Sequence, residues 1–214
     1  MEDLTLIIGN KNYSSWSLRP WLVLKHFEIP FKEIVIPLFQ PGSKEKILEI
    51  SPSGKVPSLK HKNLVIWESI AVCEYLAEFF PKKNLWPSDK EARALARAVS
   101  AEMHAGFIDL RKACPMNVKA TKPQEPTEPV KQNIARIIKI WEDSRRMFKK
   151  NGDFLFGEFS IADAMYAPVI WRFNTYGVKL TGIANEYFNT MLKLPAMVNW
   201  RQAALKEPWE INHH

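Results

Sequence analysis

The fold of this chain is decided by the stretch Asn12-Tyr13-Ser14-Ser15-Trp16-Ser17-Leu18-Arg19-Pro20-Trp21. The short apolar run Leu4–Ile8 precedes it and indicates a first β-strand, and residues 22–27 continue it as a helix. Proline is tolerated only near a helix start, so Pro20 predicts that this helix begins at about Trp16 and that both serines lie in the turn before it. Hydroxyl groups beside the unpaired N–H groups of a helix start favour an anion site.

Length and composition indicate a folded, basic protein. The 214 residues are 46% hydrophobic, which suffices for a core in one compact unit or in two small domains. The formal charge of +7 admits an anionic ligand. We expect no nucleic-acid partner, because the basic residues are scattered and form no recognised binding motif.

Cysteine usage and the chain's start point to a reducing compartment. Cys73 and Cys114 form no CxxC pair and are expected to be small buried apolar residues without a disulfide. The acidic start Met1-Glu2-Asp3 lacks an apolar signal region, and no run approaches the ~20 apolar residues of a membrane span. We therefore expect a cytoplasmic protein with no membrane partner, and we assign no function to His213-His214.

The chain divides into an α/β part and an all-helical part. Strands are predicted at 4–8, 31–36, 56–60 and 64–67, and helices at 16–27, 44–50 and 69–79. This order, βαβ followed by αββα, favours a parallel strand pair and then an antiparallel hairpin. Helices are then predicted at 90–111, 130–150, 160–173, 184–192 and 195–204. The predicted domains are 1–80 and 90–214, joined by a proline-framed linker at 81–89.

Two further motifs carry chemistry. Pro57 opens a strand, and a cis bond before it would leave the backbone of Val56 free to pair with an extended peptide; an ordinary trans proline is the other reading. Glu68-Ser69 opens a helix directly after a strand, where Ser69 suits a carboxylate and Glu68 an ammonium group. The other reading of this pair is a plain helix cap.

In this order the motifs resemble the glutathione transferase superfamily over nearly the whole chain. The matching segments are Ser14-Ser15-Trp16-Ser17-Leu18-Arg19, Val56-Pro57-Ser58-Leu59, Glu68-Ser69-Ile70-Ala71 and Ser160-Ile161-Ala162-Asp163-Ala164. The first is similar to the serine signature of the zeta-like, maleylacetoacetate isomerase-like branch. The resemblance implies a thioredoxin-like N-terminal domain, an all-α C-terminal domain, bound glutathione as co-substrate, no metal, a homodimer and a role in detoxification.

The activity implied by the resemblance is addition of the glutathione thiolate to an electrophilic small molecule. A serine hydroxyl would donate to the sulfur and stabilise the thiolate, with Ser14 favoured, Ser15 next and Tyr13 behind both. Val56, Pro57, Glu68 and Ser69 would bind the tripeptide, with Lys44, Lys55 or Gln40 on its glycyl carboxylate. The second substrate would lie against the helix at 90–111, where Met103, Phe107 and Arg111 share one face and His104 lies next to it. The other reading of Met103 and Phe107 is packing between the two domains.

The chain also departs from this branch. Maleylacetoacetate isomerases carry cysteine after the paired serines, where this chain has Trp16. Four functions therefore remain in view: a general transferase, a glutathione-dependent peroxidase or reductase, a glutathione-dependent cis-trans isomerase, and a non-catalytic interaction protein on the same scaffold. Arg19 and Arg111 are candidates to bind a carboxylate substrate.

Overall fold

The structure is a computed structural model that describes residues 3–148 and 152–211. Met1-Glu2, Asn151 and His213-His214 lie outside the described residues, as does the end of the helix predicted at 130–150. The elements of the first part are β1 (Leu4–Ile8), α1 (Ser15–His26), β2 (Lys32–Val35), α2 (Ser43–Leu48), β3 (Ser58–His61), β4 (Leu64–Trp67) and α3 (Ser69–Phe79). A short 3-10 turn, η1 (Pro81–Lys83), leads into the helices α4 (Lys90–Ala105), α5 (Ile108–Ala113), α6 (Glu128–Phe148), α7 (Ile161–Tyr176), α8 (Gly182–Lys193) and α9 (Pro195–Leu205).

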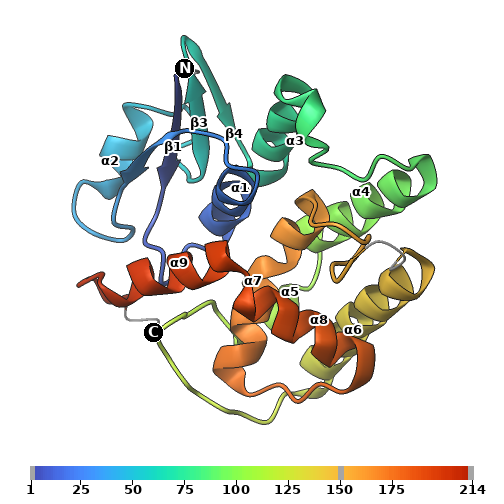
Figure 1. Ribbon diagram of the computed structural model, residues 1–214. Helices are drawn as coiled ribbons and strands as arrows, with labels where there is room; N and C mark the ends of the chain where they lie inside the picture. Colours follow the sequence, from blue (N-terminus) through green and yellow to red (C-terminus); the bar gives the residue numbers. More distant parts are fainter. Residues whose placement is uncertain (1–2, 149–151, 212–214) are drawn as a thin grey trace.

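The first part is a four-stranded mixed sheet with helices on both faces (Figure 1). The strand order is β2-β1-β3-β4, with β1 parallel to β2 and antiparallel to β3, and β3 antiparallel to β4. The predicted parallel pair and hairpin are therefore confirmed. This arrangement is the thioredoxin-like N-terminal domain, and the helices after it form the all-α C-terminal domain.

The alternation of side chains in β1 divides the core of the sheet. Leu4, Leu6 and Ile8 face the large hydrophobic core that the sheet shares with α1, α3 and the C-terminal helices. Ile7 points to the opposite face and packs with Ile47 of α2 in a second, small core. Four of the five residues of this central strand are thus positioned by burial, which fixes the register of its neighbours.

Helix α7 is the centre of the helical part, and nearly all of its residues are buried. It begins with a capping box in which Ser160 and Asp163 exchange side-chain-to-backbone hydrogen bonds, as the sequence predicts. It packs against α1, so the two parts of the chain share one continuous core (Figure 1). The domain boundaries 1–80, 81–89 and 90–214 stay a prediction.

The prediction of one continuous helix at 90–111 is wrong, because the structure has two helices there, α4 and α5. It ends at Ala105, Gly106 is extended, Phe107 adopts a left-handed φ of 61°, and α5 begins at Ile108. Arg111 folds back and donates to the carbonyl oxygens of Met103 and Gly106, which the break leaves without helical partners. The glycine is the signal for this end, because glycine commonly follows the last residue of a helix.

Candidate functional site

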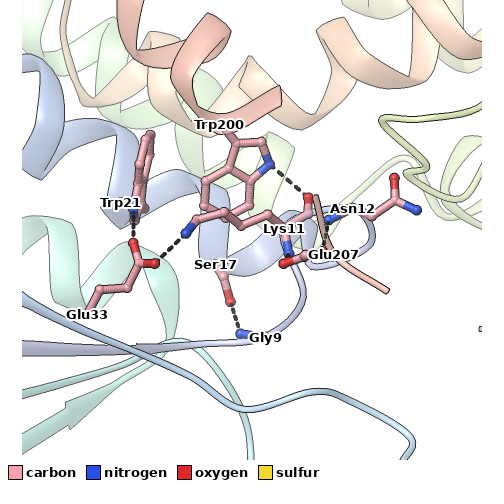
Figure 2. A network of polar contacts seen from close by, with 8 residues as sticks. All are labelled: Gly9, Lys11, Asn12, Ser17, Trp21, Glu33, Trp200 and Glu207. Atoms are coloured by element: carbon pink, nitrogen blue, oxygen red, sulfur yellow. Dashed lines mark hydrogen bonds and ion pairs between the residues drawn. The ribbon is translucent and has the colours of Figure 1, made fainter. Parts of the chain in front are cut away.

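The serine turn joins β1 to α1 and is tied to both. Ser14 is the N-cap residue of α1, and its hydroxyl donates to the hydroxyl of Ser17 at 2.7 Å. The Ser17 oxygen also accepts from the backbone N–H of Gly9 at 3.1 Å (Figure 2). The backbone N–H of Ser14 donates to the carbonyl of Asn10 at 2.8 Å. Ser14 is thus held by the strand behind it and by the first turn of its own helix.

Ser15 is the first residue of α1 and is also buried. Its backbone N–H donates to the carbonyl of Tyr13 at 2.9 Å. Within residues 3–148 and 152–211, its hydroxyl has no hydrogen-bond partner, whereas that of Ser14 is committed to Ser17. Both hydroxyls lie at the positive end of the α1 dipole, so both are placed to stabilise an anion there.

The Val56–Pro57 peptide bond is cis and lies just before β3. Among the described residues, neither the N–H nor the C=O of Val56 has a hydrogen-bond partner. Both residues line a cavity of about 160 Å³ together with Trp16, Ser53, Lys55, Glu68 and Ser69. An unpaired backbone beside a cavity is available to an extended peptide, which would dock there as an added strand.

Glu68 and Ser69 line the same cavity at the start of α3. Ser69 is fully buried, and its hydroxyl accepts from Nη1 of Arg19 at 3.5 Å. Glu68 has a left-handed φ of 68°, which is uncommon for a residue with a Cβ and often marks a functional position. The predicted Val-Pro and Glu-Ser motifs therefore meet around one cavity.

A second cavity of about 460 Å³ adjoins the first and shares Trp16, Lys55 and Val56 with it. Gln40 and Lys44 also line it, and the side chains of Lys44, Lys55 and Gln40 are exposed. The three residues predicted to reach the glycyl carboxylate thus surround one opening. Together the two cavities form a groove that runs from Ser69 past Val56 to Lys44.

Trp16 occupies the centre of this groove and is covered by basic side chains. The guanidinium of Arg19 lies 4.2 Å from its ring centre and that of Arg111 lies 4.9 Å away. The His104 ring packs edge-on at 5.2 Å, and its Nε2 lies 3.8 Å from a carboxylate oxygen of Glu68. His104 and Arg111, two of the residues predicted to bind the second substrate, line neither cavity. Both contact Trp16, which lines both cavities.

Arg19 is buried, and no carboxylate of residues 3–148 and 152–211 forms an ion pair with it. It is 1% exposed, and its Nε and Nη2 have no hydrogen-bond acceptor among the described residues. Burial lowers its pKa well below the usual value, and the nearby charges of Arg111 and Arg172 lower it further. Burial, and then the charges of Arg19 and Arg111, likewise lower the pKa of His104, against an opposing effect of Glu68. This region therefore has a surplus of positive charge.

Met103 and Phe107 lie in the hydrophobic core, with Met103 only 1% exposed. They line none of the cavities described above: Met103 is buried within α4, and the break at Gly106 turns Phe107 out of the helical register that the prediction assumed. The prediction that they share one helix face with Arg111 is therefore wrong. Their position matches packing between the two parts of the chain.

Sequence reasoning missed the structural roles of Trp16 and Ser17. Trp16 lines both cavities, and Ser17 links Ser14 to Gly9, the residue that follows β1. The spacing of Ser14 and Ser17, three residues apart at a helix start, is a signal that could have found the second role. The part of the chain that the structure describes contains no cluster of three or more metal-ligating side chains. No helix in that part is long and apolar enough to cross a membrane.

Comparisons with known proteins identify this arrangement. The family described as "Glutathione S-transferase, N-terminal domain" matches residues 13–78, and its counterpart "Glutathione S-transferase, C-terminal domain" matches residues 124–203. The "Probable maleylacetoacetate isomerase" of Caenorhabditis elegans is 29% identical over 86% of this chain and 86% of its own length. "Glutathione S-transferase A" of Pleuronectes platessa is 24% identical over 97% of this chain and 95% of its own.

Other similar proteins carry different names. The stringent starvation protein A homolog of Haemophilus ducreyi is 25% identical over 66% of this chain, and the match spans 63% of that protein. A glutathione transferase homolog from Burkholderia, solved with bound glutathione, has a TM-score of 0.71 at 22% identity and covers 97% of this chain and 100% of its own. The two family matches together span more than half of the chain, in the order and over the elements that form the groove. The chain therefore belongs to the glutathione transferase family.

Proposed function

We propose that the protein is a glutathione transferase that binds glutathione in the groove between Ser69 and Lys44 and adds its sulfur to an electrophilic small molecule. The observation that carries this proposal is the cavity where the unpaired backbone of Val56 meets the buried Ser69 at the start of α3. Relatives named as glutathione transferases and a similar structure with bound glutathione support it.

The groove offers partners to four groups of the tripeptide. Ser69 and the N–H groups at the start of α3 suit the α-carboxylate of the γ-glutamyl residue, and the charge of the buried Arg19 behind Ser69 favours the same group. Glu68, half-exposed at the cavity wall, suits the α-ammonium. The N–H and C=O of Val56 suit the cysteinyl backbone. Lys44 and Lys55 bring positive charge to the opening where the glycyl carboxylate would lie.

The serine turn would stabilise the thiolate. A free thiol has a pKa of about 8.5 and is mostly protonated at neutral pH. A hydroxyl donor at the positive end of α1 favours the thiolate over the thiol, and each unit by which the thiol pKa falls corresponds to about 1.4 kcal/mol. The serine acts as a hydrogen-bond donor and keeps its own proton. When bound, glutathione supplies the nucleophilic sulfur.

The proposal is tested by calorimetry with glutathione, followed by a conjugation assay with chlorodinitrobenzene. We expect the calorimeter to detect glutathione binding, and we expect conjugation of chlorodinitrobenzene to require glutathione. A matched variant, Ser69→Ala, should weaken binding while the exposed Ser88→Ala leaves it unchanged. An absence of glutathione binding by the wild-type protein would overturn the enzyme function.

A second candidate is glutathione-dependent cis-trans isomerisation of a maleylacetoacetate-type substrate. The relative of that name and the positive charge of Arg19 and Arg111 beside Trp16 favour it. A carboxylate substrate would be attracted to that charge. Direct assay of maleylacetoacetate isomerisation distinguishes this activity from conjugation. Glutathione binding without either turnover would instead support the non-catalytic interaction protein.

We also propose a cytoplasmic homodimer. The side chains of Leu64 and Trp67 on the edge strand β4, and of Phe79 on α3, are exposed and apolar. Leu64 and Trp67 are three residues apart on the strand and so point to opposite faces of the sheet, and a second copy of the chain packed against this edge would bury them. Sedimentation of the wild-type protein and a Trp67→Glu variant tests this: a dimer that the substitution converts to a monomer agrees with it, and a wild-type monomer contradicts it.

A further inference from the structure

The C-terminal segment after α9 holds the turn that carries the serines. Both carboxylate oxygens of Glu207 accept hydrogen bonds from consecutive backbone N–H groups, from Lys11 at 2.6 Å and from Asn12 at 3.0 Å. Figure 2 shows the Glu207 carboxylate beside these two residues. The partners are 196 and 195 positions apart in the sequence, so this contact closes nearly the whole chain on itself.

Other groups from the helical part reinforce the same two residues. The indole N–H of Trp200 in α9 donates to the carbonyl of Lys11 at 2.8 Å (Figure 2). The backbone N–H of Val118 donates to the carbonyl of Asn12 at 3.2 Å, and that of Lys119 donates to its side-chain oxygen at 2.9 Å. The backbone of the turn is therefore positioned by the C-terminal domain as well as by the strand before it.

Within the described part of the chain, the two hydrogen bonds to the Glu207 carboxylate come from backbone N–H groups, and the ammonium of Lys119 donates to the backbone carbonyl of the same residue. Across the described ranges 3–148 and 152–211, no lysine, arginine or histidine forms an ion pair with it. The ammonium of Lys11 pairs with Glu33 and lies 5.8 and 5.7 Å from the ring centres of Trp21 and Trp200 (Figure 2). Hydrogen bonds to an ionised acceptor are about twice as strong as neutral ones, so this carboxylate fixes the peptide between Lys11 and Asn12 firmly.

A short run of backbone links Asn12 to the serines. The N–H groups of Tyr13 and Ser14 both donate to the carbonyl of Asn10, at 3.1 and 2.8 Å. This hydrogen-bonded turn connects the peptide that Glu207 binds directly to Ser14, the N-cap residue of α1. A movement of the Lys11–Asn12 peptide therefore moves the hydroxyls of Ser14 and Ser15.

We infer that Glu207 is a positioning residue for the serine turn, which aims the serine hydroxyl at the sulfur of bound glutathione. The inference rests on the proposed function, because it concerns the same sulfur. Among the described residues, the carboxylate of Glu207 bonds to Lys11 and Asn12, and no hydrogen bond joins Glu207 to Val56 or Ser69. Its loss should therefore affect the thiolate and leave most of the binding contacts with the tripeptide in place.

The test compares Glu207→Ala and Glu207→Gln with Glu210→Ala, a matched removal of an exposed carboxylate three residues further on. The pH at which bound glutathione becomes a thiolate is followed by its ultraviolet absorbance, alongside the pH profile of turnover. In Glu207→Ala we expect the titration to move to higher pH by about one unit, with turnover at pH 6.5 falling about tenfold. We expect the dissociation constant for glutathione to change by less than about threefold, less than 1 kcal/mol. Glu207→Gln keeps one acceptor oxygen, so its thiol titration and turnover should lie between those of the wild type and Glu207→Ala. Glu210→Ala should match the wild type.

The outcomes separate the two proposals. If the Glu207 variants fold and lose stability while the bound thiol titrates at the wild-type pH, Glu207 is merely structural and the inference is overturned. The inference is also overturned if Glu210→Ala changes the glutathione affinity and the thiol titration as much as Glu207→Ala does. If the wild-type protein does not bind glutathione, the proposed function fails first, and the positioning role fails with it.

Discussion

The hydroxyl of Ser14 donates a 2.7 Å hydrogen bond to the hydroxyl of Ser17, three residues further along the chain. A serine has one hydroxyl hydrogen, so Ser14 must leave Ser17 in order to donate to a sulfur. Rotation about the side-chain bond is sufficient, since Ser17 keeps its second partner, the N–H of Gly9. Ser14 at the N-cap position and Ser15, whose hydroxyl has no partner among the described residues, thus give the turn two possible donors.

The two donors are separated by a pair of matched variants. We expect Ser14→Ala to lower turnover at least about tenfold with glutathione affinity nearly unchanged, because a donor aimed at a developing anion acts mainly on the chemical step. Steady-state kinetics with varied glutathione measure both quantities. Full activity in Ser14→Ala with a loss in Ser15→Ala would assign the role to Ser15. Full activity in both variants would remove the serine turn from the mechanism.

Ser69→Ala should weaken glutathione binding by about tenfold, the effect of losing one hydrogen bond to a charged group. Ser69 is fully buried at the cavity wall and its hydroxyl faces Arg19. Calorimetry measures the change, with Ser88→Ala as the control for loss of an exposed hydroxyl. An analogue of glutathione without the γ-glutamyl α-carboxylate should bind both proteins equally. A full difference with that analogue would contradict the placement of the carboxylate at Ser69.

Asp163→Ala should lower the free energy of unfolding by about 2–5 kcal/mol, because two buried backbone N–H groups lose their acceptor. The carboxylate accepts from Leu155 at 3.0 Å and from Ser160 at 2.9 Å. Burial raises its pKa to about 6 despite these hydrogen bonds. Denaturant unfolding measures the change against Asp153→Ala, which removes an exposed carboxylate. A loss no larger than that of the control would contradict the buried cap.

His104 should make the protein less stable as the pH falls below its usual pKa of about 6.5. Its pKa is lowered in the folded state, by burial first and then by Arg19 and Arg111. Between the folded and the unfolded pKa the unfolded chain binds more protons, so the free energy of unfolding decreases with falling pH in that window.

Unfolding curves of the wild type and of His104→Gln, measured at pH 7.5 and at pH 5.5, check this. We expect the variant to lose less stability than the wild type on acidification. The comparison between the two proteins cancels the opposite effect of Asp163, whose raised pKa favours the folded state as the pH falls through about 6. An equal or larger loss in the variant would show that His104 does not carry the effect.

The sheet and the motifs could be predicted because local signals determine them. The bounds Leu64–Trp67 and Ser69–Phe79 agree with the structure, since strong apolar patterns and a helix-capping position mark their ends. The meeting of Val56 with Ser69 followed from the hairpin, because the start of β3 pairs with the end of β4 at Ser58 and Trp67. The cis bond before Pro57 was one of two readings, and the structure has it.

Other features depend on contacts that no local pattern contains. The break after Ala105 carries a glycine signal, but the helix-favouring residues on both sides masked it. The contacts of His104 and Arg111 with Trp16 depend on how α4 and α5 pack against α1, which local sequence does not indicate. The contact of Glu207 with Lys11 joins the two ends of the chain, and an isolated glutamate near a C-terminus gives no sign of such a partner.

The titration of the glutathione thiol in the groove tests the central claim most directly. The claim predicts that the bound thiol becomes a thiolate one to two pH units below the ~8.5 of a free thiol, and that Ser14→Ala or Ser15→Ala returns the titration toward the free value. The ultraviolet absorbance of the thiolate, measured against pH with saturating protein, gives the pKa in each case. A bound thiol that titrates like free glutathione in the wild type and in both variants would contradict the account.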